Sequence, residues 1–177
     1  MTVSQRDSSI RFFSEILHVS KSTNQHEQVL HLITDRITRL YPCQTCAVIL
    51  IDPKTEYLNV ENSIGLSYTF CKEYRKRLAT GAIGELLWTG KPILIANQEE
   101  HPRIAEDVKL EHPFASCLAV QIAVDQRTLG YLYVDSKDKM AFSKDDIGFV
   151  QAMADLAALA INKANLHDEN LRLETVE

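Results

Sequence analysis

Residues 115–135 read ASCLAVQIAVDQRTLGYLYVD, in which two apolar runs flank a short polar stretch. The runs, Ala115 to Val124 and Leu129 to Asp135, are rich in residues that favour strands and predict a β-hairpin around Asp125-Gln126-Arg127-Thr128. Upstream, Thr45 to Asp52 and Tyr57 to Ile64 repeat this pattern on either side of a polar turn. Two such hairpins predict a mostly antiparallel sheet.

Helical patterns precede the first hairpin. Apolar residues recur at helical spacing over residues 10–19 and again further on, after a polar break. Asn24, with Glu27 three residues later, predicts the start of this second helix, and Pro42 predicts its end. The apolar face of the second helix is formed by Val29, Ile33, Ile37 and Leu40.

Between the hairpins the pattern changes several times. Phe70, Tyr74 and Leu78 predict a helix, and residues 83–88 predict a short helix that Gly90 ends. A strand is expected over residues 92–96. Residues 97–113 are polar and predict a loop with one or two helical turns, and so long a connection within a compact domain is more often functional than idle.

The last segment predicts one long helix. Ser143 and Asp146 form a capping pair, and no glycine or proline interrupts the pattern between Gly148 and the C-terminus. About 30 helical residues span roughly 45 Å, which is longer than the domain needs. Leucines at 159, 166 and 173 repeat every heptad beside Ala157 and Ala164, and predict a homodimer through the helices.

Length and composition limit the possible classes of protein. A chain of 177 residues that is 45% hydrophobic and 24% charged is expected to form a single soluble domain. Its net charge of -5 argues against nucleic acid as a ligand of this segment. The sequence shows neither an export signal nor an apolar run long enough to span a bilayer, so a cytoplasmic protein without membrane contact is expected.

Catalytic and metal-binding motifs are incomplete. The glycines form neither a phosphate-binding loop nor a nucleophile elbow. His26-Glu27 resembles the start of a zinc-protease helix motif, in which a second histidine follows the first after four residues. Here His31 follows His26 after five, so the two side chains are not placed to share a zinc ion. Cys43 and Cys46 form a Cys-x-x-Cys pair, but Cys46 enters a strand instead of a helix and no second pair completes a zinc site. We therefore predict no catalytic residue, no metal ligand and no enzymatic activity.

The order of elements resembles a GAF domain, a small-molecule sensory module of signalling proteins. The matching pieces are Gly81-Ala82-Ile83-Gly84, Thr89-Gly90-Lys91-Pro92, Ile95-Ala96-Asn97, Ser116 to Val120, Leu129-Gly130 and Phe142-Ser143. The resemblance extends from Ser14 to Ala164. It implies an α+β, GAF/PAS-like fold with a five- or six-stranded antiparallel sheet and helices on both faces. Residues 1–165 would form the domain, and residues 166–177 would begin a connector helix to an output domain.

The resemblance also implies a ligand pocket beneath the central helix and the long loop. No cofactor or ligand is assigned, because signatures of cyclic-nucleotide and bilin binding are absent. The predicted pocket residues are Tyr68, Phe70, Tyr74, Ile104, Val108 and Phe114 as apolar wall, with Asn97, His101, Arg103 and Ser116 as polar contacts.

The resemblance leaves three functions open. The first is a sensory domain that transmits its state through the C-terminal helix, in the setting of a sigma-N-dependent transcriptional activator. The second is a structural dimerisation module of a histidine kinase or cyclic-dinucleotide synthase, with its pocket filled by side chains. The third is an enzyme similar to free methionine sulfoxide reductase, which shares the fold and uses cysteines near its pocket.

Overall fold

The computed structural model describes residues 11–12, 14–16, 18–19, 26–77 and 81–174. Its centre is an antiparallel six-stranded sheet in the order β3-β2-β1-β6-β5-β4. The fold is therefore α+β, as the sequence predicted. The strands are β1 (Thr45–Ile51), β2 (Tyr57–Ile64), β3 (Lys76–Arg77), β4 (Ile93–Ile95), β5 (Ser116–Val124) and β6 (Arg127–Ser136).

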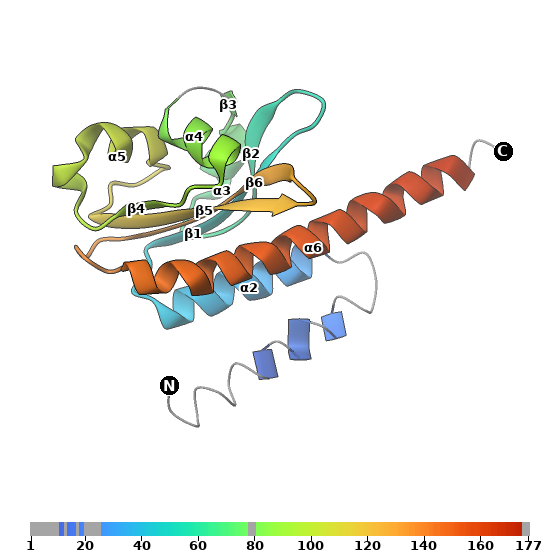
Figure 1. Ribbon diagram of the computed structural model, residues 1–177, viewed down its shortest axis with the longest axis horizontal. Coiled ribbons are helices and arrows are strands. Elements are labelled where there is room, and N and C mark those ends of the chain that lie inside the picture. Colours follow the sequence, from blue (N-terminus) through green and yellow to red (C-terminus); the bar gives the residue numbers. More distant parts are fainter. Residues whose placement is uncertain (1–10, 13, 17, 20–25, 78–80, 175–177) are drawn as a thin grey trace.

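Two long helices cover one side of the sheet, here called the helix face (Figure 1). They are α2 (His26–Leu40) and α6 (Lys144–Glu174), which pack against each other and against the sheet. Side chains alternate between the two sides of a strand, and those on the helix face join one core cluster with both helices. From the sheet, this cluster receives Cys46, Val48, Leu118, Val120, Ile122, Leu132 and Val134.

Shorter elements cover the opposite side, here called the roof face (Figure 1). A second core cluster lies between them and the sheet, and Tyr131 and Tyr133 are its largest fully buried side chains. We call the covering elements the roof. They are α3 (Tyr68–Glu73), β3, α4 (Ala82–Thr89), the 3-10 helix η1 (Gln98–Glu100) and α5 (Pro102–Val108).

The hairpin of β5 and β6 is tighter than the sequence predicted. Strand β6 begins at Arg127, so only Asp125 and Gln126 form the turn, with φ of 48° and 64°. Two consecutive residues with positive φ are typical of the hairpin turn that matches strand twist. Further along β6, a Cβ at Gly130 would lie 2.0 Å from the carbonyl oxygen of Ile49, so β1 and β6 approach closely there.

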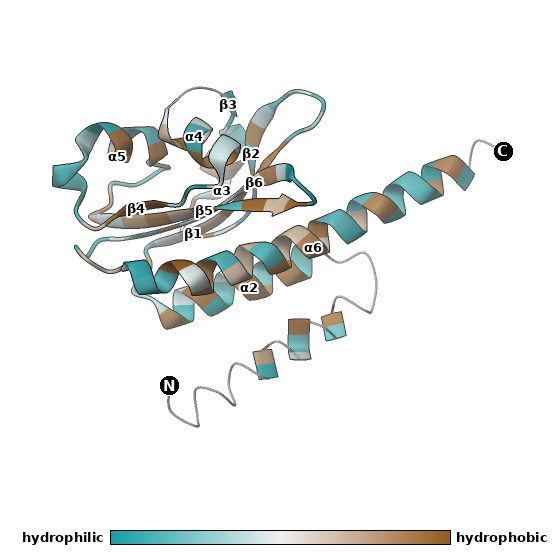
Figure 2. Cartoon of the chain, viewed as in Figure 1, coloured by the Kyte–Doolittle hydropathy of each residue, from teal (hydrophilic) through white to brown (hydrophobic). Residues whose placement is uncertain are grey.

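The C-terminal helix α6 is 31 residues long, about 46 Å at 1.5 Å per residue. Ser143 precedes it, and its backbone N–H donates to the Asp146 carboxylate at 2.8 Å, which confirms the capping pair. The first half of α6 packs on the helix face, and the second half extends beyond the sheet with spaced apolar side chains (Figures 1 and 2). Within the described ranges, no helix combines the length and apolar content needed to cross a membrane.

Several sequence predictions require correction. The helix expected to include Tyr74 ends at Glu73, and the next residues form β3 instead of continuing it. Leu40 is half-exposed instead of facing the core. Ala157 is buried in the core cluster with the sheet and α2, and Ala164 is also buried, so neither is available to a partner helix. Asn24, Leu78 and part of the first predicted helix lie outside the described residues, whereas Phe12 and Ile16 belong to the core.

Candidate functional site

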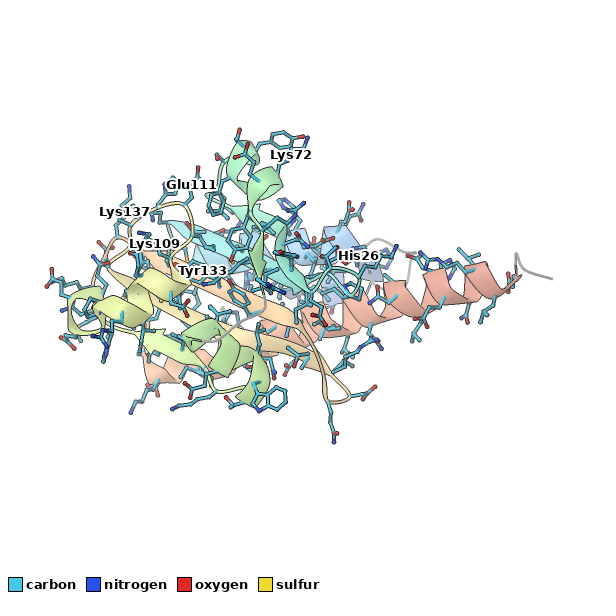
Figure 3. The ribbon with its side chains drawn as sticks, turned by 90° about the horizontal axis from the view of Figure 1, so that it is seen from above. His26, Lys72, Lys109, Glu111, Tyr133 and Lys137 are labelled. Carbon is cyan, nitrogen blue, oxygen red and sulfur yellow. The ribbon has the colours of Figure 1, made fainter. Side chains whose placement is uncertain are left out.

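The sheet under the roof carries polar atoms within an apolar core. The hydroxyl oxygens of Tyr74 and Tyr131 lie 3.5 Å apart, and the Tyr133 hydroxyl donates to Asp135 at 2.9 Å. Tyr131 and Tyr133 are fully buried. Seen from the roof side, Tyr133 lies near the middle of the molecule, with Glu111 and Lys137 toward its margin (Figure 3). We call the polar surface formed by these three phenol groups, beneath the roof, the floor.

Asp135 is a buried carboxylate at the end of this floor, only 1% exposed. Besides the Tyr133 hydroxyl, the Gln44 side-chain amide approaches it at 3.4 Å. In the part of the chain that the structure describes, no ion pair joins Asp135 to a cationic side chain. Burial raises the pKa of Asp135 above its ordinary value, because hydrogen bonds compensate only part of the lost hydration.

The pH dependence of stability should reveal this group. Folding raises the pKa of Asp135. The native protein therefore loses stability as the pH increases from the pKa that Asp135 has in the unfolded state through the pKa that it has in the folded state. Asp135→Asn removes that titration. We expect the free energy of unfolding of the variant, minus that of the wild type, to increase with pH across this interval. Urea titrations from pH 4 to pH 8 measure it, and a difference independent of pH would contradict the prediction.

An ion pair holds the roof together. Lys76 of β3 donates to the Asp107 carboxylate of α5 at 2.9 Å, and the Ile83 backbone N–H of α4 donates to its second oxygen at 3.2 Å. Partial burial acts to raise the pKa of Asp107, but these hydrogen bonds outweigh it and leave that pKa lowered. Asp107 therefore joins three roof elements and remains ionised at neutral pH.

A groove opens beside the sheet edge, between α4, β4 and α5. Its volume is about 180 Å³, its walls are mainly aliphatic, and an acid, a base and an imidazole are among its lining residues. Such a combination suits a small molecule with an apolar body and polar groups. The lining residues are Ala82, Glu85, Leu86, Lys91, Pro92, Ile93, Leu94, Ile95, His101 and Ile104.

The predicted apolar pocket residues occupy three environments. Ile104 lines the groove, and Tyr68 is 75% exposed at the start of α3. Phe70 and Tyr74 are partly buried against the core of the roof face, with ring centroids 5.4 Å apart. Val108 and Phe114 are fully buried in that core. The structure brings four of the six together under the roof and one to the groove.

The predicted polar contacts are dispersed. His101 lines the groove and Arg103 is exposed on α5. The Asn97 side-chain oxygen accepts from the Glu99 backbone N–H at 3.2 Å and so caps η1. Ser116 is buried, and its hydroxyl donates to the Asp138 carbonyl oxygen at 2.6 Å, in the loop that precedes α6. Ser116 therefore holds this loop on the helix face of β5, opposite the floor.

Three of the four cysteines, Cys43, Cys46 and Cys117, lie in environments that suppress thiolate formation. Burial raises the pKa of Cys43 to about 12, and the pKa values of Cys46 and Cys117 are also well above normal. All four cysteines, including Cys71, are free thiols. Because the thiolate is the reactive form, the Cys-x-x-Cys pair has the electrostatics of structural cysteines.

One group of potential metal ligands occurs at the start of α2. Donor atoms of His26, Glu27 and Glu61 lie within 4.8 Å of one another. Both carboxylates are exposed, and Glu27 in the first helical turn complements the helix dipole. The Nε2 atom of His26 lies 3.4 Å from a carboxylate oxygen of Glu61, and this contact is an ion pair when the ring is protonated. We assign these residues to surface charge pairing.

Comparison with known proteins identifies the fold. A family model described as GAF domain matches residues 25–161. The chain belongs to the GAF family. The fold of this GAF domain is that of a sensory module of signalling proteins.

Solved structures of proteins with different roles resemble this chain. The GAF domain of an Acinetobacter phosphoenolpyruvate-protein phosphotransferase has a TM-score of 0.75 at 20% identity, covering 94% of this chain and 97% of its own. A Neisseria meningitidis free methionine-R-sulfoxide reductase, solved with its substrate, has a TM-score of 0.68 at 15% identity, covering 87% and 88%. A far-red cyanobacteriochrome photoreceptor has a TM-score of 0.62 at 16% identity, covering 93% and 99%. At these identities the likeness concerns the fold alone.

Sequence reasoning missed most of the groove. Its wall is formed by consecutive residues of β4, which were predicted as a strand but not as a binding surface. The link between Lys76 and Asp107 was also missed, because Lys76 falls within the stretch that Phe70, Tyr74 and Leu78 predicted as a helix. The one available signal was the pair Gly90 and Pro92, which turns the chain between α4 and β4 and so brings both walls together.

Proposed function

We propose that this GAF domain is a non-catalytic sensor that binds a small molecule in the groove between α4, β4 and α5. The groove carries the proposal, because it combines aliphatic walls with Glu85, Lys91 and His101. Lys91 and Glu85 lie 3.9 Å apart as an exposed ion pair, so a ligand that carries both an acidic and a basic group could replace each partner of that pair, while His101 offers a hydrogen bond. An amphipathic or zwitterionic metabolite matches this chemistry better than a purely apolar one.

The second part of the proposal concerns output. Helix α6 begins beneath the sheet and extends beyond it, so it can carry a change in the domain to a following module (Figure 1). Two copies would pair through its exposed leucines, and the following module would be the output domain of a transcriptional activator of the sigma-N-dependent kind. A cytoplasmic location agrees with four cysteines that all remain free thiols.

A structural role is the second candidate, and one observation favours it. Val108 and Phe114 are buried in the core of the roof face, 1% and 3% exposed, so side chains of the protein itself fill that part of the face. In this alternative the domain only dimerises, as a module of a histidine kinase or cyclic-dinucleotide synthase. A ligand in the groove distinguishes the two candidates.

Thermal-shift screening of a metabolite library tests the sensory proposal. A ligand at about a hundredfold excess over its Kd stabilises the native state by about 2.7 kcal/mol, which is roughly 5 °C or more in Tm for a domain of this size. For any hit, His101→Ala and Ile104→Ala should remove the shift, because both side chains line the groove. Both are exposed, so the variants should remain folded.

Arg103→Ala is the matched control, since Arg103 lies on the same helix, is equally exposed and does not line the groove. Hits that survive His101→Ala and Ile104→Ala would place the site elsewhere. A library without hits would favour the structural role. Cysteine-dependent reduction of free methionine sulfoxide would contradict the non-catalytic part of the proposal and favour the reductase alternative.

A further inference from the structure

The segment between β6 and α6, residues 137–142, is called the strap. Two buried hydroxyls hold its inner side. The Ser116 hydroxyl donates to the Asp138 carbonyl oxygen at 2.6 Å and accepts from the Ala141 N–H at 3.3 Å. The Ser136 hydroxyl accepts from the Asp138 N–H at 3.1 Å. Buried backbone groups need such partners, so the strap is fixed to β5 and β6.

The other side of the strap contacts the beginning of the long connection. The Met140 N–H donates to the Ala96 carbonyl oxygen at 2.7 Å, and the Lys139 ammonium lies 2.7 Å from the Glu99 carboxylate. Ala96 directly follows Ile95, which lines the groove, and η1 leads directly to His101, which also lines it. The contacts of the strap are therefore within two residues of the groove.

The strap also contains a strained residue. Met140 has φ of 57°, a left-handed conformation that is uncommon for residues other than glycine. Such a conformation persists only where surrounding contacts impose it, and the hydrogen bond to Ala96 is one of these contacts. If the segment that joins Ala96 to η1 moves away, Met140 loses this hydrogen bond and can relax to negative φ.

The strap leads straight into α6. Phe142 is buried in the core of the helix face, with its ring centroid 5.8 Å from that of Tyr41. Ser143 then donates to the Asp146 carboxylate and begins the helix. In Figure 1 the strap and α5 lie at the same end of the sheet, the end at which α6 starts. A change in the strap therefore acts on the first turn of α6.

We propose that the strap couples the groove to α6, with Met140 as its two-state element. The hydrogen bond to Ala96 and the ion pair of Lys139 with Glu99 of η1 hold Met140 in its left-handed conformation and keep the first turn of α6 ordered. A ligand that displaces the segment from Ala96 to Glu99 releases Met140 and loosens that turn. This coupling gives the proposed sensor its output step, and it can be tested without any ligand.

Hydrogen exchange on the full chain tests the coupling. Glu99→Ala removes the ion pair with Lys139, and we expect amide exchange in residues 144–149 to accelerate about twofold to fivefold, the range for a surface ion pair. Glu106→Ala is the control, because it breaks the comparable ion pair with Lys109 on α5 without touching the strap. The control should leave residues 144–149 unchanged.

Met140→Gly provides the second variant. Glycine adopts positive φ without strain, so the strap should keep its conformation even when Glu99 is replaced. In the Met140→Gly background, Glu99→Ala should accelerate exchange of residues 144–149 by less than it does alone. Equal acceleration in both backgrounds, acceleration confined to residues 97–101, or the same response in Glu106→Ala would each overturn the coupling. A failed ligand screen would leave these results unaffected, so the two proposals can fail separately.

Discussion

Gly130→Ala is expected to prevent folding, or to lower the free energy of unfolding by about 4 kcal/mol or more, at the upper end for single substitutions. A Cβ at this position would lie 2.0 Å from the Ile49 carbonyl oxygen and 2.8 Å from the Leu50 Cα. Both are backbone atoms of the neighbouring central strand, so no side-chain rotation relieves the clash. Strand β1 would have to move away from β6, which would disrupt both core clusters.

Gly148→Ala is the control for this substitution. Gly148 lies in α6, and a Cβ there meets nothing within 4 Å. Alanine is the better helix former by about 1 kcal/mol, so this variant should be slightly more stable than the wild type. Urea titrations followed by circular dichroism measure both variants. A Gly130→Ala protein that unfolds at the wild-type urea concentration would show that β1 and β6 are not paired in this register.

Replacing Leu159, Leu166 and Leu173 together by glutamate is expected to convert a dimer into the 20.1 kDa monomer. These leucines are 60%, 53% and 70% exposed and repeat every seven residues along α6. Leucine at one core position of each heptad favours a two-stranded coiled coil. Lys163 and Asn170 would occupy the alternate core position, and polar residues there fix the register of a pair while limiting its stability. Burying three such leucines would provide most of the association energy.

Light scattering at roughly tens of micromolar protein, where stable dimers persist, measures the effect. Leu171→Glu is the matched control, because Leu171 lies on the same part of the helix, is 48% exposed and falls outside the heptad series. It should leave the mass unchanged. A wild type that is already monomeric at these concentrations would remove the dimer from the proposal. Because the three leucines are exposed, circular dichroism should show that the monomer remains folded.

The sequence allowed the hairpins and the long helix to be predicted because their signals are local. Apolar runs of strand-favouring residues identified β5 and β6, and the capping pair of Ser143 and Asp146 located the start of α6. Strand β3 was not predictable in this way. It is two residues long, Lys76 and Arg77, and is held by pairing with β2 and by the ion pair to Asp107. Neither contact leaves a periodic pattern.

In the candidate site, too, some residues could be predicted from the sequence and others could not. His101 and Ile104 were predicted as ligand contacts from their loop, and both line the groove. Ser116 was predicted as a ligand contact too, but its hydroxyl hydrogen-bonds to the strap. The direction of a strand side chain depends on where the strand begins, because a shift of one residue reverses every side chain. Which elements cover each face depends on long-range packing.

The two edges of the sheet restrict how copies of this protein can assemble. Strand β3 has two residues and pairs only with Tyr57 and Leu58 of β2, and β4 has three residues and pairs only with residues 117–119 of β5, so each edge of the sheet is stepped instead of continuous. Open-ended growth by strand addition is favoured by long, flat edges, which these are not. The proposed association through α6, in contrast, would use the same helix surface on both partners and would be complete once two copies have met. Pairing of this kind would end at a dimer and would leave the interrupted sheet edges outside the contact.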